Sequence, residues 1–322
     1  MKVLFLGGAG MIGSAASAEA VRRGLDVTVV TRGDPKRALP DGIRHIAADV
    51  RDVEGLRTAL GGERYDAVVN WIGFTPEHLA GHAALFADAG QYVFISTCSV
   101  FARPVPQLPI TESSPRSQPV FGYARDKVAC ELLLEQEARE TGFRLTIVRP
   151  FHTYDRTVVP VLPGWTAVER MRAGLPVIVH GDGTSLWTLM HADDFARAFV
   201  PLLGSAHAVG ESVNVVSGDI LTWDQIHLFL AAAAGVREPL LVHRSSETIG
   251  RRWPGWAEVL EHDFRHTMLF DTAKLRRLVP DFAPRISLSA GLDEVIRFHD
   301  ATASARRVDA DLAAAFDDLV GE

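Results

Sequence analysis

The chain has 322 residues, of which 47% are hydrophobic and 23% are charged, a composition typical of a globular protein. Its formal net charge is −7 at pH 7 and it has no basic cluster, which argues against nucleic acid as a partner. No apolar run reaches the roughly 20 residues that a membrane helix needs, and two cysteines cannot form a disulfide framework. We therefore expect a cytoplasmic enzyme or binding protein without a membrane anchor.

The first half of the chain alternates short apolar runs with helical patterns, which indicates βαβ units and a parallel sheet. Because helices would cover both faces of such a sheet, its strands should be almost wholly apolar. The runs that fit are Lys2–Leu6, Asp26–Thr31, Arg44–Ala47, Ala67–Asn70, Tyr92–Ser96 and Leu145–Val148. The clearest helical patterns are Met11–Arg23, Glu77–Ala89 and Tyr123–Thr141.

The pattern changes after Arg149-Pro150, where prolines and glycines become frequent. We expect an N-terminal α/β domain over residues 1–150 and a smaller, mainly helical, substrate-binding domain over residues 151–322. Later segments, such as Ser212–Val216, could return to the large sheet. The predicted fold class is α/β, a doubly wound parallel sheet with a smaller helical domain.

A glycine-rich turn, Gly7-Gly8-Ala9-Gly10-Met11-Ile12-Gly13, separates the first strand from the first helix. Gly7 would permit the tight turn, Gly10 the approach of a pyrophosphate, and Gly13 close packing of helix and strand. The N–H groups of the helix that opens at Met11 and Ile12 would attract the anion. A flexible turn is the alternative interpretation, but the position directly after the first strand favours a dinucleotide such as NAD or NADP.

The end of the second strand should decide which dinucleotide is bound. An acidic side chain there would accept hydrogen bonds from the ribose of NAD, but this chain has Thr31 and Arg32, with Lys36 and Arg37 close behind. A guanidinium suits a phosphate, so Arg32 favours NADP, with a solvated loop charge as the alternative. Asp49-Val50, after the third strand, could contact the adenine.

Tyr123-Ala124-Arg125-Asp126-Lys127 is the most informative segment for chemistry. Residues four apart share one face of a helix, so the ammonium of Lys127 should lie beside the phenol of Tyr123. A nearby charge in a partly closed cleft could bring the tyrosine pKa from about 10 toward neutral. Such a phenol could exchange the hydroxyl proton while hydride passes to or from a nicotinamide. A surface pair on an amphipathic helix is the alternative.

A third group should hydrogen-bond the substrate oxygen. The fifth strand ends in Ser96-Thr97-Cys98-Ser99, which offers several hydroxyls at the carboxyl edge of the sheet, where such folds bind ligands. Cys98 is expected to be a small packed residue, because no nearby histidine motif would activate it.

These motifs resemble those of the extended short-chain dehydrogenase/reductases, the NAD-dependent epimerase/dehydratase group. The resemblance spans nearly the whole chain and rests on the glycine turn, on Tyr123 and Lys127, on Arg149-Pro150, and on Gly181-Asp182-Gly183 followed by His191-Ala192-Asp193-Asp194. It implies a Rossmann-type fold and pairing into a homodimer through helices such as Tyr123–Thr141. It also aligns Thr97 with the catalytic Ser/Thr, with Ser99 as the fallback, and gives Lys127 the nicotinamide ribose.

The chain departs from that family near the expected site, where Val100-Phe101-Ala102 replaces the usual Val-Tyr-Gly. Asn70-Trp71-Ile72-Gly73 replaces the usual turn after the fourth strand, and Trp187 stands where nucleotide-sugar enzymes commonly have an arginine for the diphosphate. Loss of this cation weakens the case for a nucleotide-linked sugar. Packing at the domain interface is the role that we expect for Trp187, and stacking on a substrate is the alternative.

The leading hypothesis is therefore an NAD(P)-dependent epimerase or ketoreductase that acts on a secondary hydroxyl or ketone of a sugar or sugar-like molecule. Thr97, Tyr123 and Lys127 would be its catalytic residues, and no metal is expected. The competing hypothesis is a non-catalytic, dinucleotide-sensing or RNA-associated protein on the same scaffold. The presence of both Tyr123 and Lys127 and the lack of a basic patch argue against it.

Overall fold

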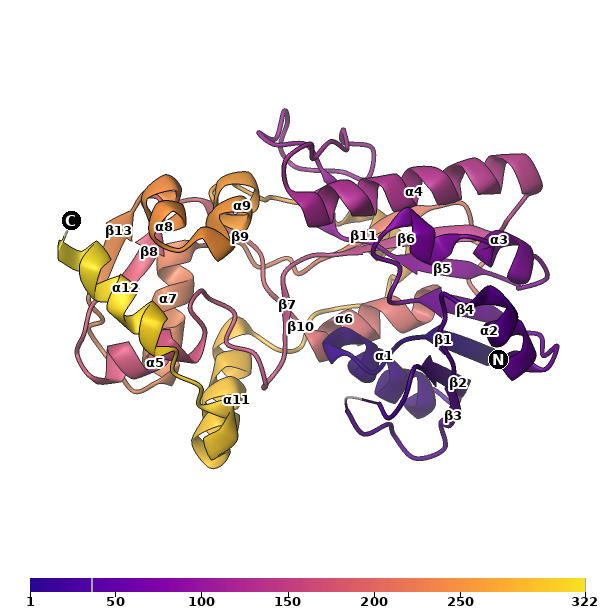
Figure 1. The fold of residues 1–322 in the computed structure, drawn as a ribbon, viewed down its shortest axis with the longest axis horizontal. Coiled ribbons are helices and arrows are strands. Elements are labelled where there is room, and N and C mark those ends of the chain that lie inside the picture. Colours follow the sequence, from indigo (N-terminus) through magenta and orange to yellow (C-terminus); the bar gives the residue numbers. More distant parts are fainter. Residues whose placement is uncertain (36, 322) are drawn as a thin grey trace.

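The computed structural model describes residues 1–35 and 37–321, so Lys36, one of the cations expected near the cofactor, lies outside the described residues. Figure 1 shows two lobes joined through the short strands β7 (Thr153–Tyr154) and β10 (Met190–His191). The N-terminus lies in the lobe that holds the large sheet, and the chain ends in the other lobe.

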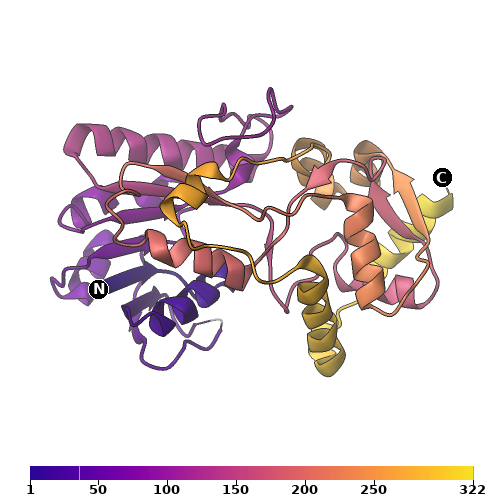
Figure 2. The ribbon, with the colours of Figure 1, turned by 180° about the vertical axis from the view of Figure 1, so that it is seen from behind.

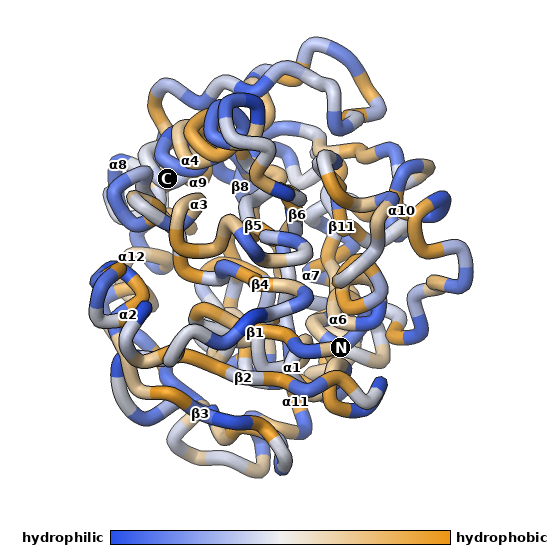
Figure 3. The backbone as a smooth tube through the Cα atoms, turned by 90° about the vertical axis from the view of Figure 1, so that its right-hand side faces the viewer, coloured by the Kyte–Doolittle hydropathy of each residue, from blue (hydrophilic) through white to orange (hydrophobic). Residues whose placement is uncertain are grey.

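Seven parallel strands form the large sheet, in the order β11-β6-β5-β4-β1-β2-β3, and Figure 3 shows β3, β2, β1, β4 and β5 following one another. Their bounds are β1 Lys2–Leu6, β2 Asp26–Thr31, β3 Arg44–Ala47, β4 Ala67–Asn70, β5 Tyr92–Ile95, β6 Leu145–Pro150 and β11 Ser212–Val215. The predicted α/β fold with a doubly wound parallel sheet is confirmed. The strand order reverses between β1 and β4, because β2 and β3 lie on one side of β1 and the later strands lie on the other. In this class of sheet, ligands bind at such a switch point.

Helices cover both faces of the sheet, as its apolar strands require. Val3 and Phe5 of β1 face α1 (Met11–Arg22) and α6 (Ala192–Phe199), which lie side by side in Figure 2. The alternate residues Leu4 and Leu6 face the opposite layer, since successive side chains of a strand point to opposite sides. That layer contains α2 (Val53–Leu60), α3 (His82–Leu85) and α4 (Gly122–Thr141).

Three later segments lie in the sheet lobe: α6 covers the sheet beside α1, β11 pairs with β6, and α10 (Ala273–Leu278) packs against β11. In the second lobe, helices surround the paired strands β8 and β13. The remaining bounds are α5 Trp165–Arg172, β8 Val177–His180, β9 Leu186–Trp187, β12 Leu221–Thr222, α7 Trp223–Ala233, β13 Leu241–Arg244, α8 Ser246–Arg252, α9 Ala257–Val259, α11 Leu288–Ala301 and α12 Ala310–Gly321. A π-helical turn spans Leu260–Phe264.

The prediction of one continuous helix over Glu77–Ala89 is wrong. A 3-10 turn at Pro76–Leu79 is followed by α3, and Gly81 between them has a φ of 78°, in the left-handed region that ends a helix. Tertiary contacts override the helical pattern here. The fully buried His82 ring hydrogen-bonds the carbonyl of Val50 at 2.9 Å and thereby fixes the start of α3.

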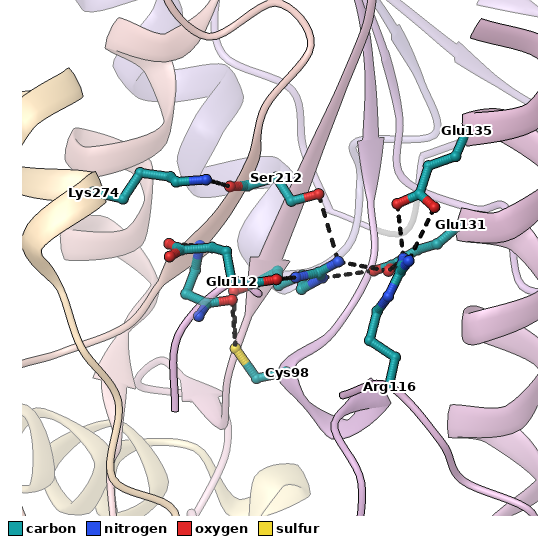
Figure 4. A network of polar contacts seen from close by, with 9 residues as sticks. Cys98, Glu112, Arg116, Glu131, Glu135, Ser212 and Lys274 are labelled. Atoms are coloured by element: carbon teal, nitrogen blue, oxygen red, sulfur yellow. Dashed lines mark hydrogen bonds and ion pairs between the residues drawn. The ribbon is translucent and has the colours of Figure 1, made fainter. Parts of the chain in front are cut away.

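A buried ion network attaches α4 to the sheet (Figure 4). Arg149 of β6 donates two hydrogen bonds of 2.8 Å to the Glu131 carboxylate, and these side chains are 1% and 0% exposed. Arg116 donates to Glu131 and to Glu135, one helical turn further along α4. Because α4 also carries Tyr123 and Lys127, this network fixes their height above the sheet.

Replacing Glu131 with Gln should lower the free energy of unfolding by about 3–5 kcal/mol, because the Arg149 guanidinium would stay buried without its counter-charge. Equilibrium denaturation in urea, followed by circular dichroism, measures the change. Arg64→Gln is the control, since it removes an exposed pair with Asp88 and should leave the unfolding free energy nearly unchanged. A Glu131→Gln protein as stable as the wild type would contradict this role for the network.

Candidate functional site

The β1–α1 turn has the shape that a phosphate-binding turn needs. Gly7 has a φ of 91°, and a Cβ on Gly13 would lie 2.6 Å from the backbone of Gly8, so helix and strand pack closely only with glycine there. A Cβ on Gly10 would meet nothing within 4 Å. The turn therefore leaves open space in front of the N–H groups of Met11 and Ile12, at the start of α1.

The residues expected around the adenosine lie beyond β2 and β3. Arg32 is exposed, and among the described residues it makes no hydrogen bond or ion pair. Arg37, by contrast, pairs with Asp155 and donates to the Thr157 hydroxyl at 2.7 Å, so its guanidinium is occupied by the other lobe. Arg32 is thus the described cation that is free to meet a phosphate after β2.

The remaining residues of that expected region are held by neighbours. The Thr31 hydroxyl hydrogen-bonds the His45 ring at 2.7 Å. Asp49 forms two hydrogen bonds with the Arg51 guanidinium, which lower the pKa of its carboxyl to about 2. Val50 is buried, and its carbonyl accepts the hydrogen bond from His82.

A cavity of about 330 Å³ lies at the carboxyl edge of the sheet, between the two lobes. Its lining comes from the start of α1, from the ends of β4, β5 and β6, from α4 and, across the cleft, from the second lobe. Three of the predicted residues, Thr97, Tyr123 and Lys127, line it together with Ile12 of the glycine turn. The wall on the second lobe includes His152, Trp187, Asp263 and Phe264.

Lys127 is buried, and its ammonium donates to the carbonyl oxygens of Gly73 at 2.7 Å and Ile95 at 2.8 Å. Asn70 shapes the receiving turn, because its side-chain oxygen accepts the N–H groups of Ile72 and Gly73. Burial lowers the pKa of Lys127 to about 8. An ammonium has three N–H donors, so one is left for a ligand in the cavity.

Tyr123 lies one helical turn before Lys127 on α4, lines the same cavity and remains 43% exposed. The prediction that Lys127 lowers its pKa toward neutral is wrong. Burial of the hydroxyl end raises the pKa of Tyr123 above its ordinary value, hydrogen bonding with Thr97 acts in the opposite direction, and the Asp263 charge raises it further. The physical reason is that burial of the hydroxyl end is the largest contribution to the pKa of Tyr123, and Lys127 is not among the groups that shift it.

The two hydroxyls considered for the substrate oxygen have different partners. Thr97 Oγ1 accepts the N–H of Ser99 at 3.2 Å, and its hydroxyl lies beside that of Tyr123. Ser99 Oγ donates to Asp263 at 2.8 Å, and the second oxygen of Asp263 accepts from Arg103 at 2.7 Å. Since Ser99 is held in this way, Thr97 is the freer of the two hydroxyls.

Asp263 and Phe264 could not be found by sequence reasoning. They lie more than 130 residues after Tyr123 in a short π-helical turn, and no motif marks them. Such π-turns often occur at functional sites, but their hydrogen bonding is not readable from the side-chain pattern. In residues 1–35 and 37–321, no cluster of three His, Cys, Asp or Glu side chains could hold a metal ion. Nor is any helix in those ranges long and apolar enough to span a membrane.

The burial of Lys127 predicts how stability depends on pH. The unfolded chain binds this proton more tightly than the folded one, so the free energy of unfolding should rise between the folded pKa of about 8 and the ordinary value of 10.5. Relative to Lys127→Met, the wild type should gain up to about 3 kcal/mol across that window. Urea denaturation of both proteins at several pH values measures the gain, and parallel curves would contradict the assigned burial cost.

Comparisons with known proteins show the family and the fold of the chain. A model of the NAD dependent epimerase/dehydratase family matches residues 3–216. The chain is 25% identical to the chloroplast stem-loop binding protein of 41 kDa b from Arabidopsis thaliana, over 91% of this chain and 78% of that protein. It is also 25% identical to 2'-dehydrokanamycin reductase from Streptomyces kanamyceticus, over 88% of this chain and 81% of that protein.

Solved structures share the fold. UDP-glucose 4-epimerase from Bifidobacterium longum, in complex with NAD+ and UDP, superposes with a TM-score of 0.74 at 17% identity and covers 95% of this chain and 100% of that one. Because the family model spans more than half of the sequence and the Rossmann-type sheet is present, this chain belongs to the NAD-dependent epimerase/dehydratase family of the extended short-chain dehydrogenase/reductases.

Proposed function

We propose that this protein is an NAD(P)-dependent oxidoreductase or epimerase that acts on a secondary hydroxyl or ketone of a sugar-like molecule. The observation that carries the proposal is one cavity lined by Thr97, Tyr123 and Lys127, with the glycine turn at its edge through Ile12. A proton donor, an oriented hydroxyl and a buried cation therefore lie beside a turn suited to a pyrophosphate.

The residues present fit a dinucleotide. The open space at Gly10 and the start of α1 would take the pyrophosphate, and the third N–H of Lys127 would meet the nicotinamide ribose. Arg32 supports NADP over NAD, since a guanidinium suits the 2′-phosphate. When bound, the nicotinamide ring gives or takes the hydride at the substrate carbon.

The proton chemistry falls to Tyr123. Its raised pKa keeps the phenol protonated at neutral pH, so in this state it can give a proton to a ketone oxygen more readily than it can take one from an alcohol. Thr97 would hydrogen-bond the same oxygen. The similarity to a protein named as a reductase supports net reduction over epimerisation.

An RNA-associated role is the second candidate, and the similarity to the plant stem-loop binding protein is the observation that favours it. The net charge of −7 argues against it, because nucleic-acid affinity comes mainly from cations that neutralise phosphates. We therefore propose that nucleic acid is not a ligand.

We further propose a cytoplasmic homodimer that pairs through α4, on which Leu132 is an exposed apolar side chain. Both cysteines are buried and free, which fits a reducing compartment. Sedimentation velocity tests the dimer, and a monomer at micromolar concentration would reject it.

Replacing Tyr123 with Phe should reduce turnover by about 10²–10⁴ and leave cofactor affinity largely unchanged, because only the exchangeable proton is removed. Consumption of NADPH or NADH with a panel of sugar-derived ketones measures turnover. Tyr65→Phe is the matched control, since that hydroxyl bonds Arg44 and Glu63, away from the cavity. Full activity in Tyr123→Phe would reject the proposed chemistry.

Replacing Gly10, the N-cap of α1, with Ala should lower stability only slightly and weaken dinucleotide binding by at least tenfold. The new methyl group meets no protein atom, but it fills the space that a pyrophosphate needs. Calorimetric titrations with NAD+ and NADP+ measure the affinity and also test the preference assigned to Arg32. Gly218→Ala, another site with nothing within 4 Å, is the control. Equal affinity in Gly10→Ala and wild type would place the dinucleotide elsewhere.

A further inference from the structure

The wall of the cavity on the second lobe is built from aromatic rings. Phe264 stacks on His152, with 5.5 Å between ring centroids and 24° between planes, and Trp187 lies 5.0 Å from Phe264. Phe151 packs against Trp187 at 4.5 Å. Phe264 is partly exposed, so it offers an apolar face to whatever enters from the cleft.

On the second lobe, the charged side chain of the cavity lining is already paired. The ionisable members of the lining besides Tyr123 are Lys127, His152 and Asp263. Lys127 points at two carbonyl groups on the sheet side, and Asp263 is neutralised by Arg103, whose side chain is 3% exposed. Within the described lining, the half of the cavity on the second lobe therefore has no free cation.

The hydrogen bond from Trp187 fixes the state of His152. The indole Nε1–H donates to His152 Nδ1 at 2.9 Å. An indole nitrogen can only donate, so Nδ1 must be the acceptor and a neutral ring must carry its proton on Nε2. Burial lowers the pKa of His152 to about 4, which keeps the ring neutral at physiological pH.

The opposite nitrogen of that ring is unused. His152 Nε2 makes no hydrogen bond to residues 1–35 or 37–321. It is also absent from the fully buried atoms that lack a partner, so it remains accessible. Because His152 lines the cavity, its Nε2–H is a fixed donor that can reach a molecule bound there. Trp187 thus has a role besides packing, which is to orient His152.

We propose that the substrate is an uncharged hydroxyketone or polyol, free of any diphosphate, and that His152 Nε2–H binds its second oxygen while Thr97 and Tyr123 hold the reacting one. The aromatic face of Phe264 takes the C–H face of the molecule. This inference rests on the proposed function and names its substrate class. His152 is the specificity-determining residue, and Trp187 is the positioning residue behind it.

A nucleotide-linked sugar fits this wall poorly. Its diphosphate would lose water without gaining an uncommitted cation in the lining, and burial of an unpaired anion is costly. A neutral hydroxyl or carbonyl oxygen loses little on entry, since one fixed N–H replaces the water that it leaves. The cavity therefore selects against negative charge.

The first experiment measures binding to the cofactor-loaded protein, without turnover. Myo-inositol, D-galactose and dihydroxyacetone are the neutral probes, and UDP and UDP-glucose are the charged ones, all followed by ligand-detected NMR. We expect at least one neutral probe to bind at millimolar concentration and both uridine compounds to show no binding at the same concentration. Binding of UDP or UDP-glucose, or failure of all neutral probes, would overturn the proposal.

The second experiment tests His152 with matched variants. His152→Phe removes the donor and should weaken neutral-probe binding by about threefold to tenfold, the usual effect of one neutral hydrogen bond. His152→Gln keeps an N–H at a similar reach and should restore most of the affinity. His207→Phe is the control, because His207 is exposed on the surface. Equal affinity in His152→Phe and wild type would overturn the role of His152.

The third measurement reads the imidazole directly. Nitrogen-15 NMR of histidine-labelled protein, assigned by the signals lost in His152→Gln, should show the Nε2–H tautomer at neutral pH. Trp187→Phe keeps an aromatic ring but removes the indole donor, and this preference should weaken. A wild-type ring protonated on Nδ1 would overturn the inference. Since none of these readouts needs catalysis, they stay distinct from a failure of the Tyr123→Phe test.

Discussion

The ion pair between Arg149 and Glu131 is the interaction on which the geometry of the site depends. Arg149 lies on β6 within the sheet and Glu131 on α4, one turn beyond Lys127. With no water to compete, the two parallel hydrogen bonds allow little variation in distance or angle. The pair therefore fixes the helix at the height where Lys127 reaches the carbonyl groups of Gly73 and Ile95.

The cavity exists because two lobes meet over the carboxyl edge of the sheet. Ser99 reaches across to Asp263, and Arg37 reaches across to Asp155. Ser99 follows β5 and Arg37 follows β2, so both lie in loops after sheet strands. Their partners lie elsewhere: Asp155 follows the connecting strand β7, and Asp263 belongs to the second lobe. The sheet therefore shapes the part of the cavity lined by Tyr123 and Lys127, and a different part of the chain shapes the opposite wall.

Burial controls protonation at this site more than charge pairing does. It favours the neutral form of each group, so it lowers the pKa of Lys127 and His152 and raises that of Tyr123. The result is an ammonium that can still be charged at pH 7, an imidazole that is a pure donor on one side, and a phenol that keeps its proton. All three then carry N–H or O–H groups at the cavity.

The sequence by itself determined the parallel sheet and the candidates for the reaction. Alternation of apolar runs with helices is a local pattern, and so are the glycine turn at residues 7–13 and the spacing of Tyr123 and Lys127 on one helix. A local pattern is readable wherever the neighbours along the chain are also the neighbours in space. The break at Gly81 shows the limit of this approach, since a contact of His82 with a distant carbonyl outweighed the helical pattern.

Only the tertiary structure decided what each side chain faces. The direction of the Lys127 ammonium, the commitment of Ser99 to Asp263 and the orientation of His152 by Trp187 all join residues at least 30 positions apart. Hydrogen-bond direction and burial depend on which groups converge from separate strands, and residue spacing along the chain does not encode that convergence. The candidate residues could therefore be identified from the sequence, whereas their burial and their hydrogen-bond partners were set by folding.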